Sequence, residues 1–274
     1  MKERVREWKE FLLPYQQAVD ELKVKFKAIR KEYRETSKYS PIEFVTGRVK
    51  KISSIIEKCE RRNIDIDDIQ EVMEDIAGIR IMCQFKDDIY NVVDLIHKRS
   101  GKDLEVLYEK DYIANPKESG YKSYHIVIKY SVQTAFGEEN ILAELQIRTL
   151  AMNFWATIEH SLNYKYKKDI PADVKSKLVN AAKAVTILDD EVCGIRDEII
   201  NAQQIFELKS NVVLDITKNL KRLEKYCEPE KIKKYYEEFD DVWESEDEEK
   251  FKEFLVKIKS EIPLYNMSNE GDEN

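Results

Sequence analysis

A row of polar side chains follows one face of a predicted strand in the middle of the chain. Residues 141–148 alternate between apolar and polar types, and successive side chains on a strand point to opposite faces. The apolar residues therefore form a core face, while Glu144, Gln146 and Arg148 share the other face. A carboxylate, an amide and a guanidinium in a row suit ligand binding or acid–base chemistry. The alternative is a solvated sheet face.

A second predicted strand, residues 79–85, alternates in the same way and carries Arg80 on its polar face. Asp75 lies just ahead of this strand, with Gly78 in the intervening turn. Mg²⁺ binds a few carboxylates together with phosphate oxygens, so Asp75 is a candidate metal ligand. The alternative role of this carboxylate is a helix or turn cap.

Cations and a hydroxyl recur at helical spacing before these strands. Lys50, Ser54 and Lys58 stand four residues apart in a predicted helix over residues 49–61, so they share one face of it. Arg48 stands at the start of that helix, where exposed amide donors favour anions. This arrangement suits a triphosphate, and a solvated lysine face is the alternative.

The loop before residue 124 combines a glycine, a tyrosine and several cations. Gly120 allows backbone and ligand to approach closely, and Tyr121 offers a flat face for stacking on a base. Three of the chain's seven glycines (Gly47, Gly78 and Gly120) fall in these polar segments, which favours ligand contact over a plain tyrosine-rich loop. The other candidate side chains of this segment are Lys110, Lys117, Lys122 and His125.

Hydrophobic periodicity predicts the elements that position these residues. Apolar residues recur every three or four positions between Tyr15 and Tyr33, which predicts an amphipathic helix that ends at Ser40-Pro41. Helical patterns resume near Leu150 and are interrupted at Pro171. This order predicts an α/β or α+β fold, in which helices flank a sheet. The predicted strands are residues 79–85, 124–132 and 141–148.

Composition is that of a globular protein with a core, at 42% hydrophobic and 36% charged residues. No apolar run approaches the roughly 20 residues of a membrane-spanning helix, and the first residues lack the apolar segment of a secretory signal. The four cysteines are widely separated and form no C-x-x-C pair. We therefore expect reduced thiols in a cytoplasmic protein with no membrane contact.

Charge is distributed unevenly along the chain. The net charge is −8, but residues 228–274 alone contain 16 acidic and 7 basic residues, so the rest of the chain is close to neutral. This argues against nonspecific nucleic-acid binding as the main function. Beyond residue 208 the chain still has a helical pattern and becomes increasingly acidic, and we expect the last eight residues to be disordered.

Five motifs occur in series and at compatible spacing between residues 8 and 204. They are T-G-R-V-K, D-I-A-G-I-R, K-E-S-G-Y-K-S-Y-H, A-E-L-Q-I-R-T and M-N-F-W-A-T-I-E-H-S-L-N-Y-K-Y. Together they resemble the synthetase domain of the RelA/SpoT alarmone enzymes, and more narrowly the small RelQ-like synthetases. The resemblance implies a mixed β-sheet of nucleotidyltransferase-like type wrapped by α-helices. It also implies a synthetase domain over residues 1–208, followed by an acidic, mostly helical C-terminal extension over residues 209–274.

The resemblance implies a reaction, in which the β,γ-pyrophosphate of ATP moves to the 3′-hydroxyl of GTP or GDP, with GMP as a further acceptor, and AMP leaves. Asp75 and Glu144 match residues that bind Mg²⁺, and Glu144 also matches the carboxylate that activates the acceptor hydroxyl. The positions that match ATP-binding residues are Arg48, Lys50, Ser54, Lys58, Arg80 and Lys110. The positions that match guanine-nucleotide-binding residues are Lys117, Tyr121, His125 and Gln146.

The resemblance also implies a direction for the chemistry. Bifunctional relatives carry a hydrolase domain that requires a His-Asp doublet, and the three histidines here precede Lys98, Ile126 and Ser161. We therefore expect a synthetase without hydrolase activity, acting in stringent-response signalling.

The small members of the family assemble as homotetramers, and in RelQ-like enzymes a central cleft binds the pentaphosphate product pppGpp, which activates the enzyme. A solvated helix edge is the alternative role for the lysines at the matching positions. The positions that match this allosteric cleft are Lys23, Lys27, Arg30, Phe44, Thr46 and Asn153.

Two rival functions share the fold. Toxic relatives pyrophosphorylate adenine nucleotides or the 3′ end of tRNA, and the acidic C-terminal segment argues against the tRNA acceptor. An inert RNA-binding regulator is the second rival, although a protein that only binds RNA has no need of both Asp75 and Glu144. Some relatives bind RNA, and the acidic segment disfavours this here as well.

Overall fold

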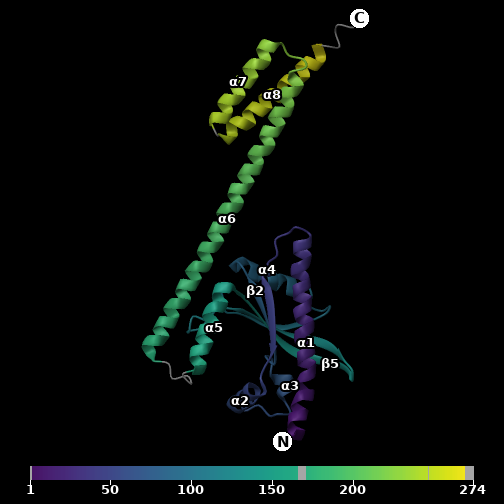
Figure 1. The fold of residues 1–274 in the computed structure, drawn as a ribbon, viewed down its shortest axis with the longest axis vertical. Helices are drawn as coiled ribbons and strands as arrows, with labels where there is room; N and C mark the ends of the chain where they lie inside the picture. Colours follow the sequence, from purple (N-terminus) through teal and green to yellow (C-terminus); the bar gives the residue numbers. More distant parts are fainter. Residues whose placement is uncertain (1, 166–170, 246, 269–274) are drawn as a thin grey trace. The chain divides into compact units, whose positions relative to one another are not determined.

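A computed structural model describes residues 2–165, 171–245 and 247–268 of the chain (Figure 1). The chain divides into two compact units, Met1–Cys193 and Gly194–Asn274, which are described separately below. The first unit contains α1 (Lys2–Glu35), β1 (Phe44–Val49), α2 (Ile52–Arg62), α3 (Ile69–Val72), β2 (Ala77–Cys83), α4 (Lys86–His97), β3 (Glu105–Asp111), β4 (Tyr124–Thr134), β5 (Gly137–Thr149), α5 (Leu150–Lys165) and the beginning of α6 (Ala172–Leu223).

The first unit is built on one five-stranded sheet with the strand order β1-β2-β5-β4-β3. β2 and β5 are parallel, whereas the other three pairs are antiparallel. The predicted mixed sheet flanked by helices is therefore confirmed. The parallel register places Gly78 beside Glu144 and Arg80 beside Gln146, while β4 brings His125 to the other side of Gln146.

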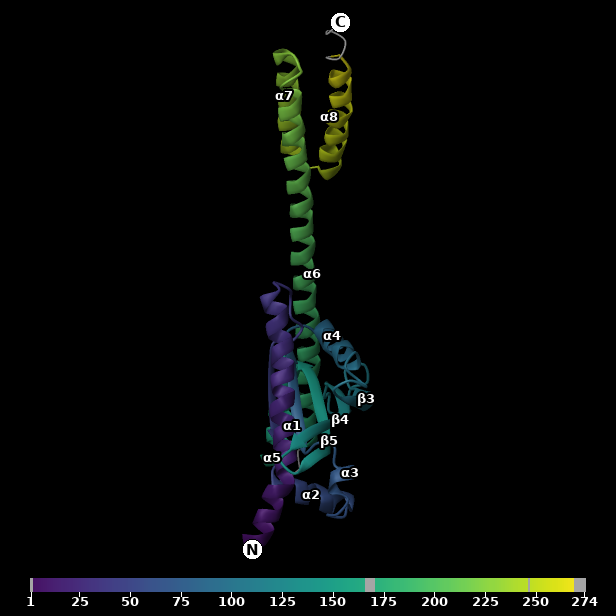
Figure 2. The ribbon, with the colours of Figure 1, turned by 90° about the vertical axis from the view of Figure 1, so that its right-hand side faces the viewer.

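Helix α1 lies across the sheet and contacts β1, β2, β4 and β5 (Figure 1 and Figure 2). Its predicted apolar stripe is confirmed, because Val19, Leu22 and Phe26 are buried in the same core as Ile79 and Leu145. Each such side chain stabilises the fold by about 1.5–3 kcal/mol relative to an exposed position. One face of the sheet is therefore committed to the core, and alternate residues must face the other way.

Two element boundaries differ from the sequence prediction. Helix α1 begins at Lys2, runs through Pro14 and ends at Glu35, ahead of the expected stop at Ser40-Pro41. The residues after Glu35 form a turn in which Ser37 has a positive φ of 54°. A helix cannot continue through that left-handed conformation, so it ends before the proline.

The predicted helix over residues 49–61 begins instead at Ile52, because residues 44–49 form the edge strand β1. Arg48 is therefore a strand residue, and Lys50 precedes the helix that carries Ser54 and Lys58. The prediction of one helical face for the three residues is wrong. Strand β1 has only six residues, of which only Val45 is buried, so its apolar and polar residues do not alternate clearly enough to predict a strand. The sequence prediction missed the edge strand β3 for the same reason.

Two glycines serve packing between elements. A Cβ atom at Gly47 would lie 2.8 Å from Ile79 Cδ1 and 2.9 Å from Val19 Cγ1, so this glycine lets α1 approach the sheet. Gly120 has a φ of +85°, and a Cβ atom there would lie 2.5 Å from Ala182 Cβ in α6. The structure therefore gives Gly47 and Gly120 a packing role, and the expected contact with a ligand stays a prediction.

The second unit contains the end of α6 together with α7 (Pro229–Ser245) and α8 (Glu248–Ser268). It has a separate hydrophobic core, so the acidic segment is a packed helical structure. Of the eight residues expected to be disordered, Met267 and Ser268 end α8, and the other six lie outside the described residues. The core residues are Ile216, Leu220, Leu223, Ile232, Tyr235, Phe251, Phe254 and Ile258.

The predicted domain boundary between residues 208 and 209 lies within α6, whereas the compact units divide between Cys193 and Gly194. In the described ranges, none of the helices combines the length and the apolar character that crossing a membrane requires.

The Gly120–Ala182 contact leads to a stability prediction. We expect Gly120→Ala to destabilise the first unit by about 2–5 kcal/mol, because a left-handed alanine costs about 1–2 kcal/mol and overpacking about 1–3 kcal/mol. Gly101→Ala is the matched control, since Gly101 has a similar φ of +77° but no atom within 4 Å of the added carbon. Urea unfolding of the two variants measures the difference. Equal losses of stability would contradict the steric contribution from α6.

Candidate active site

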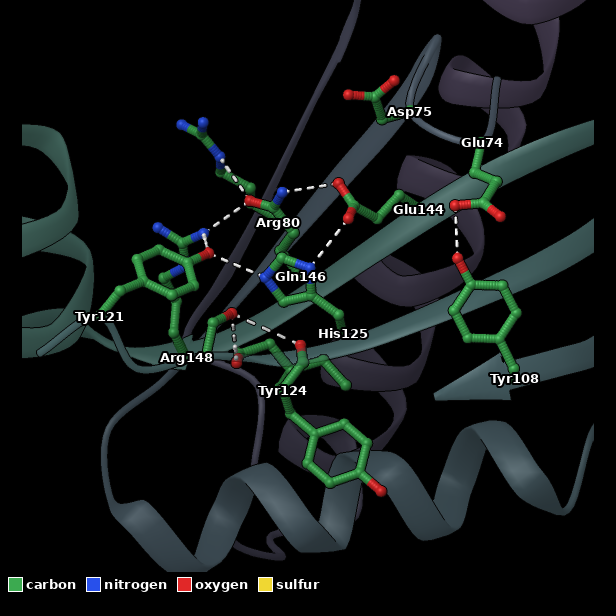
Figure 3. Close-up of polar contacts among 12 residues, drawn as sticks. Glu74, Asp75, Arg80, Tyr108, Tyr121, Tyr124, His125, Glu144, Gln146 and Arg148 are labelled. Atoms are coloured by element: carbon green, nitrogen blue, oxygen red, sulfur yellow. Dashed lines mark hydrogen bonds and ion pairs between the residues drawn. The ribbon is translucent and has the colours of Figure 1, made fainter. Parts of the chain in front are cut away.

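The sheet face directed away from α1 carries the residues that the sequence singled out. Arg48 of β1, Arg80 of β2, and Glu144 and Gln146 of β5 line one cavity of about 270 Å³. Figure 3 shows Arg80, Gln146 and Glu144 meeting over the sheet, with Asp75 beside Glu144. The structure therefore gathers residues from positions 46 to 146 into one place. The full lining is Thr46, Gly47, Arg48, Lys50, Asp75, Gly78, Ile79, Arg80, Glu144 and Gln146.

Asp75 forms one end of the cavity and pairs with two lysines. Lys50 Nζ donates to Asp75 Oδ2 at 2.7 Å, and Lys58 Nζ donates to Asp75 Oδ1 at 2.7 Å. Burial alone would raise the pKa of Asp75, but the two ammonium groups outweigh it and hold that pKa below its usual value. This end of the cavity thus holds two cations around one ionised carboxylate, an arrangement suited to a polyanion and a metal ion.

Glu144 lies at the centre of the cavity and receives hydrogen bonds on both oxygens. Its Oε1 lies 2.8 Å from His125 Nδ1, and its Oε2 accepts a hydrogen bond of 2.7 Å from Gln146 Nε2. Burial acts to raise the pKa of Glu144, but the contacts with His125 and Gln146 prevail and lower it. The carboxylate is therefore ionised at neutral pH and can accept a proton.

Tyr121 follows the tight turn at Gly120 and lies beside His125. Its hydroxyl is 2.8 Å from His125 Nε2 and accepts a hydrogen bond of 2.9 Å from Arg148 Nη2. Lys117 Nζ lies 4.9 Å from the centre of the Tyr121 ring, within the range of a cation–π contact. The predicted guanine-side residues Lys117, Tyr121, His125 and Gln146 therefore lie together, next to Glu144.

The arginines make this face strongly cationic. Arg80 Nε donates to Gln146 Oε1 at 3.3 Å, and the pKa of Arg80 is lowered by burial and then by the neighbouring cations Arg148 and Arg48. Three guanidinium groups on one sheet face suit phosphate oxygens and the flat face of a base. Arg48 is exposed and lines the cavity together with Arg80.

Three predicted ATP-binding residues, Ser54, Lys58 and Lys110, lie outside the cavity lining, although Lys58 pairs with Asp75, which belongs to it. Ser54 is half-buried in α2, one helical turn before Lys58. Lys110 is exposed on β3, with its Nζ 4.8 Å from the centre of the Tyr108 ring, and it pairs in register with His125. Tyr108 in turn donates a hydrogen bond to Glu74, the neighbour of Asp75 (Figure 3). Lys110 is therefore at the rim of the site.

Two residues at this site had no predicted role. Arg148 stands out in the sequence only as the third polar residue of β5, and the structure buries it beneath Tyr121. Tyr112 packs edge-on against His125, with ring centres 5.2 Å apart, and Lys117 Nζ lies 4.5 Å from the centre of its ring. Only the density of tyrosines in the loop points to Tyr112.

The carboxylates fit a magnesium ion. Asp75 and Glu144 line the same cavity. The negative charge of Asp75 acts to raise the pKa of Glu144, but the contacts with His125 and Gln146 outweigh it and the pKa remains lowered. Two carboxylate ligands suit Mg²⁺, which completes its shell with water and phosphate oxygens. Within the described ranges there is no group of three or more acidic, histidine or cysteine side chains that could hold a metal by itself. A shared protein–nucleotide site is consistent with both observations.

The residues predicted for the allosteric cleft do not all meet. Lys27, Arg30 and Phe44 line a second cavity of about 590 Å³, together with Lys31 and Arg34. Thr46 lines the cavity of Glu144 instead.

The other two residues of that set lie apart from both cavity linings. Lys23 pairs with Asp20 at 3.2 Å on α1. Asn153 lies on α5, and its buried Oδ1 has no hydrogen-bond partner among the described residues. Part of the predicted set thus forms a basic pocket between α1 and β1.

Comparison with known proteins identifies relatives of the first unit. The family model described as "Region found in RelA / SpoT proteins" matches residues 47–169. The chain is 55% identical over 204 residues to "GTP pyrophosphokinase YjbM" of Bacillus subtilis, an alignment that covers 74% of this chain and 95% of that protein.

Two solved structures of small alarmone synthetase 1 from Bacillus subtilis have the same fold. The one bound to its product pppGpp is 55% identical with a TM-score of 0.68, covering 71% of this chain and 98% of that one. The one bound to AMPCPP is 52% identical with a TM-score of 0.64, covering 72% and 99%. The predicted synthetase fold is therefore confirmed.

The lowered pKa of Asp75 leads to a pH prediction. In the presence of a chelator, we expect Asp75→Asn to lose about 1.5–3 kcal/mol of stability at pH 7, since charged hydrogen bonds contribute about that much. A lowered native pKa stabilises the fold above the unfolded value of about 3.9, and this contribution is lost as pH falls through the native pKa. The difference between wild type and variant should therefore shrink below about pH 4.

Urea unfolding from pH 7 to pH 2.5 measures this difference. Asp67→Asn, in an exposed loop, is the control and should change stability little at either pH. A difference for Asp75→Asn that stays constant down to pH 3 would contradict the ion-pair account.

Proposed function

This chain belongs to the family of RelA/SpoT proteins, and we infer that it is a GTP pyrophosphokinase of the small alarmone synthetase type. It transfers the β,γ-pyrophosphate of ATP to the 3′-hydroxyl of GTP or GDP and releases AMP. The observation that supports this best is the single cavity in which a lysine-paired Asp75 stands beside an ionised Glu144. One half of that cavity suits a triphosphate, and the other suits a hydroxyl that must lose a proton.

We propose that ATP binds between β1, α2 and β2. Lys50 and Lys58 neutralise its phosphates, with Ser54 and Lys110 as further contacts, while Arg48 and Arg80 hold the adenine between them. Arg48, Lys50 and Arg80 line one cavity, and Lys58 pairs with Asp75 of the same cavity. The likeness to a structure bound to AMPCPP also supports this placement. Because pyrophosphoryl transfer involves mostly phosphate charge, alignment and neutralisation supply most of the catalysis.

The guanine nucleotide binds on the other side of Glu144. Tyr121 stacks on the guanine, and Lys117, His125 and Gln146 line the acceptor side. These residues come from β4, β5 and the loop before β4, and their mutual contacts support a joint role. This placement brings the acceptor ribose next to Glu144 and opposite the phosphates.

Glu144 acts as the general base. Its carboxylate accepts the proton of the 3′-hydroxyl as that oxygen attacks the β-phosphorus of ATP, and the bond from this phosphorus to the α,β-bridging oxygen breaks to release AMP. Asp75 and Glu144 would hold a Mg²⁺ ion, which would neutralise phosphate charge when bound. His125 and Gln146 keep the carboxylate directed into the cavity.

We expect synthesis without hydrolysis from these 274 residues, which contain no His-Asp doublet. All of the proposed catalytic residues lie in the first unit, before Gly194. This is consistent with a synthetase domain that ends by residue 208, followed by an extension that takes no part in the chemistry.

A transfer assay tests the proposed reaction. With γ-labelled ATP, Mg²⁺ and one acceptor at a time, we expect label to move to GTP or GDP with release of AMP. Glu144→Gln should lower the rate by about 10²–10⁴-fold, the usual contribution of a general base. Glu138→Gln, at the far end of the same strand, is the matched control and should leave the rate unchanged.

The choice of acceptor distinguishes the rival functions. Label on tRNA or on adenine nucleotides alone would place the enzyme with the toxic relatives. No transfer to any acceptor would favour the inert RNA-binding regulator and contradict the proposed function.

We propose that the enzyme is a homotetramer that pppGpp activates through the basic pocket lined by Lys27 and Arg30. The pocket carries four cations and one carboxylate, as an anionic ligand requires. Exposed apolar side chains of the first unit support assembly, because burying them against another copy removes apolar surface from water. They are Leu150, Phe154 and Ile158 on α5 and Ile187 and Leu188 on α6.

We expect pppGpp to raise the synthetic rate cooperatively, with a ratio of rates that falls to about one in Lys27→Ala and Arg30→Ala. Lys129→Ala, exposed on β4, is the control and should keep the wild-type ratio. Sedimentation of the same samples should give about four times the chain mass of 32.4 kDa. Activation that survives in both pocket variants would contradict the allosteric site, and a monomer mass would contradict the tetramer.

A further inference from the structure

The loop that carries Tyr121 rests on α6 through three successive residues. A Cβ atom added to Gly120 would lie 2.5 Å from Ala182 Cβ. The Tyr121 ring packs against the buried cluster that contains Ala182. Lys122 Nζ donates to Thr186 Oγ1 at 2.8 Å. Ala182 and Thr186 are four residues apart, so one face of α6 receives the whole segment.

Hydrogen bonds within the loop fix its shape but not its place. The Gly120 N–H donates to the Lys117 carbonyl at 2.8 Å, and the Lys117 N–H donates to the Tyr121 carbonyl at 3.3 Å. Both bonds join residues of the same turn, so they leave its distance from the sheet open. Two sets of contacts can determine that distance. One is with α6, and the other joins the Tyr121 hydroxyl to His125 and Arg148.

The methyl group of Ala182 sets the closest approach of the loop to α6. Ala182 is buried, and its Cβ is the nearest atom to the place of a Cβ on Gly120. The next atoms are the Val179 Cα at 3.8 Å and the Ala182 Cα at 4.0 Å, both at ordinary contact distance. The contact is therefore tight at one methyl group. A larger side chain at either position must push the loop away from α6, because the interior is close-packed.

We infer that Ala182 is a positioning residue for the guanine nucleotide, because its small side chain lets the loop rest on α6 and so places the Tyr121 ring. The inference rests on the proposed function, in which guanine stacks on Tyr121. Ala182 itself lies outside the cavity lining. A binding group has to lie within about 0.5 Å of its productive place, so a displaced loop weakens stacking.

The effect of Ala182 is selective for one substrate. The proposed ATP-binding residues belong to β1, α2, β2 and β3 and to the residue after β1, outside this loop. Displacing the loop therefore weakens the guanine side and spares the ATP side. An alanine that served packing alone would change the stability of the first unit without distinguishing the two nucleotides.

Initial rates of the full chain test this selectivity. We expect Gly120→Ala to raise the KM for GTP about tenfold, the equivalent of about 1.4 kcal/mol, with the KM for ATP retained. Gly101→Ala is the control, because Gly101 has a similar φ of +77° but no atom within 4 Å of the added carbon. It should leave both KM values unchanged.

A second substitution on α6 tests the contact itself. Ala182→Gly removes the methyl group that Gly120→Ala meets, so we expect the double variant to regain most of the affinity for GTP. The cost of a left-handed alanine remains in its stability. Gly120→Ala with Ala181→Gly is the matched control, because Ala181 is exposed on the same helix. It adds the same helical glycine without relieving the contact, and its KM for GTP should stay raised.

A variant on the helix side covers the case in which Gly120→Ala does not fold. Ala182→Val enlarges the same contact from α6 and should raise the KM for GTP in the same selective way. Ala181→Val is its control and should retain the wild-type KM values. Calorimetry of GTP binding, with Mg²⁺ and AMPCPP in place of ATP, should give the same order of affinities without any transfer.

The outcomes separate the inference from the proposed function. Equal effects on ATP and GTP, wild-type binding of GTP by folded Gly120→Ala, or no recovery on adding Ala182→Gly would each overturn the role of Ala182 while alarmone synthesis stands. A wild type that binds GTP but transfers nothing would remove the proposed reaction, and the calorimetric order would still decide the role of Ala182. A wild type that binds no GTP would overturn both.

Discussion

The parallel pairing of β2 with β5 is the contact on which the site depends. Its register sets Gly78 beside Glu144 and Arg80 beside Gln146. A slip of one residue would turn Leu145 into the cavity and Glu144 into the core. The core face prevents this, because Ile79, Ile81 and Leu145 are fully buried beneath α1 and cannot be exchanged for polar neighbours at low cost. The apolar face of the sheet thus determines the chemistry of the opposite face.

The charged side chains on that opposite face form ion pairs in which phosphate oxygens could replace a carboxylate. Without phosphate, Lys50 and Lys58 satisfy Asp75, and the three share one ion-pair cluster. Under the proposed function, a triphosphate would bring oxygens that compete for the same ammonium groups and would free Asp75 to contact a metal ion. The partners of Glu144 are instead His125 and Gln146. The two carboxylates therefore differ in their partners, since two ammonium groups hold Asp75 whereas an imidazole and an amide hold Glu144.

The sequence predicted those features of the site that depend on residues close together in the chain, and missed those that depend on distant residues. Alternation along a strand is local, so the row of Glu144, Gln146 and Arg148 was predicted correctly, as was the helix that covers the other face. The four-residue spacing of Lys50, Ser54 and Lys58 gave a wrong prediction, because the edge strand β1 extends to Val49 and the helix begins only at Ile52. Lys50 and Lys58 do meet, but they meet through Asp75 and not through one helical face.

Long-range contacts were beyond local patterns. The pairing of Arg148 with Tyr121 joins residues 27 positions apart, and no periodicity connects a loop with a strand in this way. Two glycines also show that local patterns do not reveal long-range contacts. Gly47 and Gly120 were noticed as unusual, but the atoms that require them belong to α1 and β2 for Gly47 and to α6 for Gly120, far away in the sequence.

The beginning of α6 belongs to the site for a related reason. Gly120 packs against Ala182, Lys122 donates to Thr186 at 2.8 Å, and Trp155 Nε1 donates to the Leu178 carbonyl at 3.0 Å. These contacts fasten the loop that carries Tyr121 to a helix that follows all five strands.

Because Tyr121 contacts His125, which contacts Glu144, the position of α6 bears on the surroundings of Glu144. A buried hydrogen bond of 2.9 Å from Thr149 to Asp189 ties the end of β5 to the same helix. The contacts that hold the Tyr121 loop and the end of β5 are therefore complete only when the chain has passed residue 189, some forty residues beyond its last strand. Under the proposed function, a substitution in this part of α6 would alter catalysis without touching the cavity, because it would move the loop that carries Tyr121.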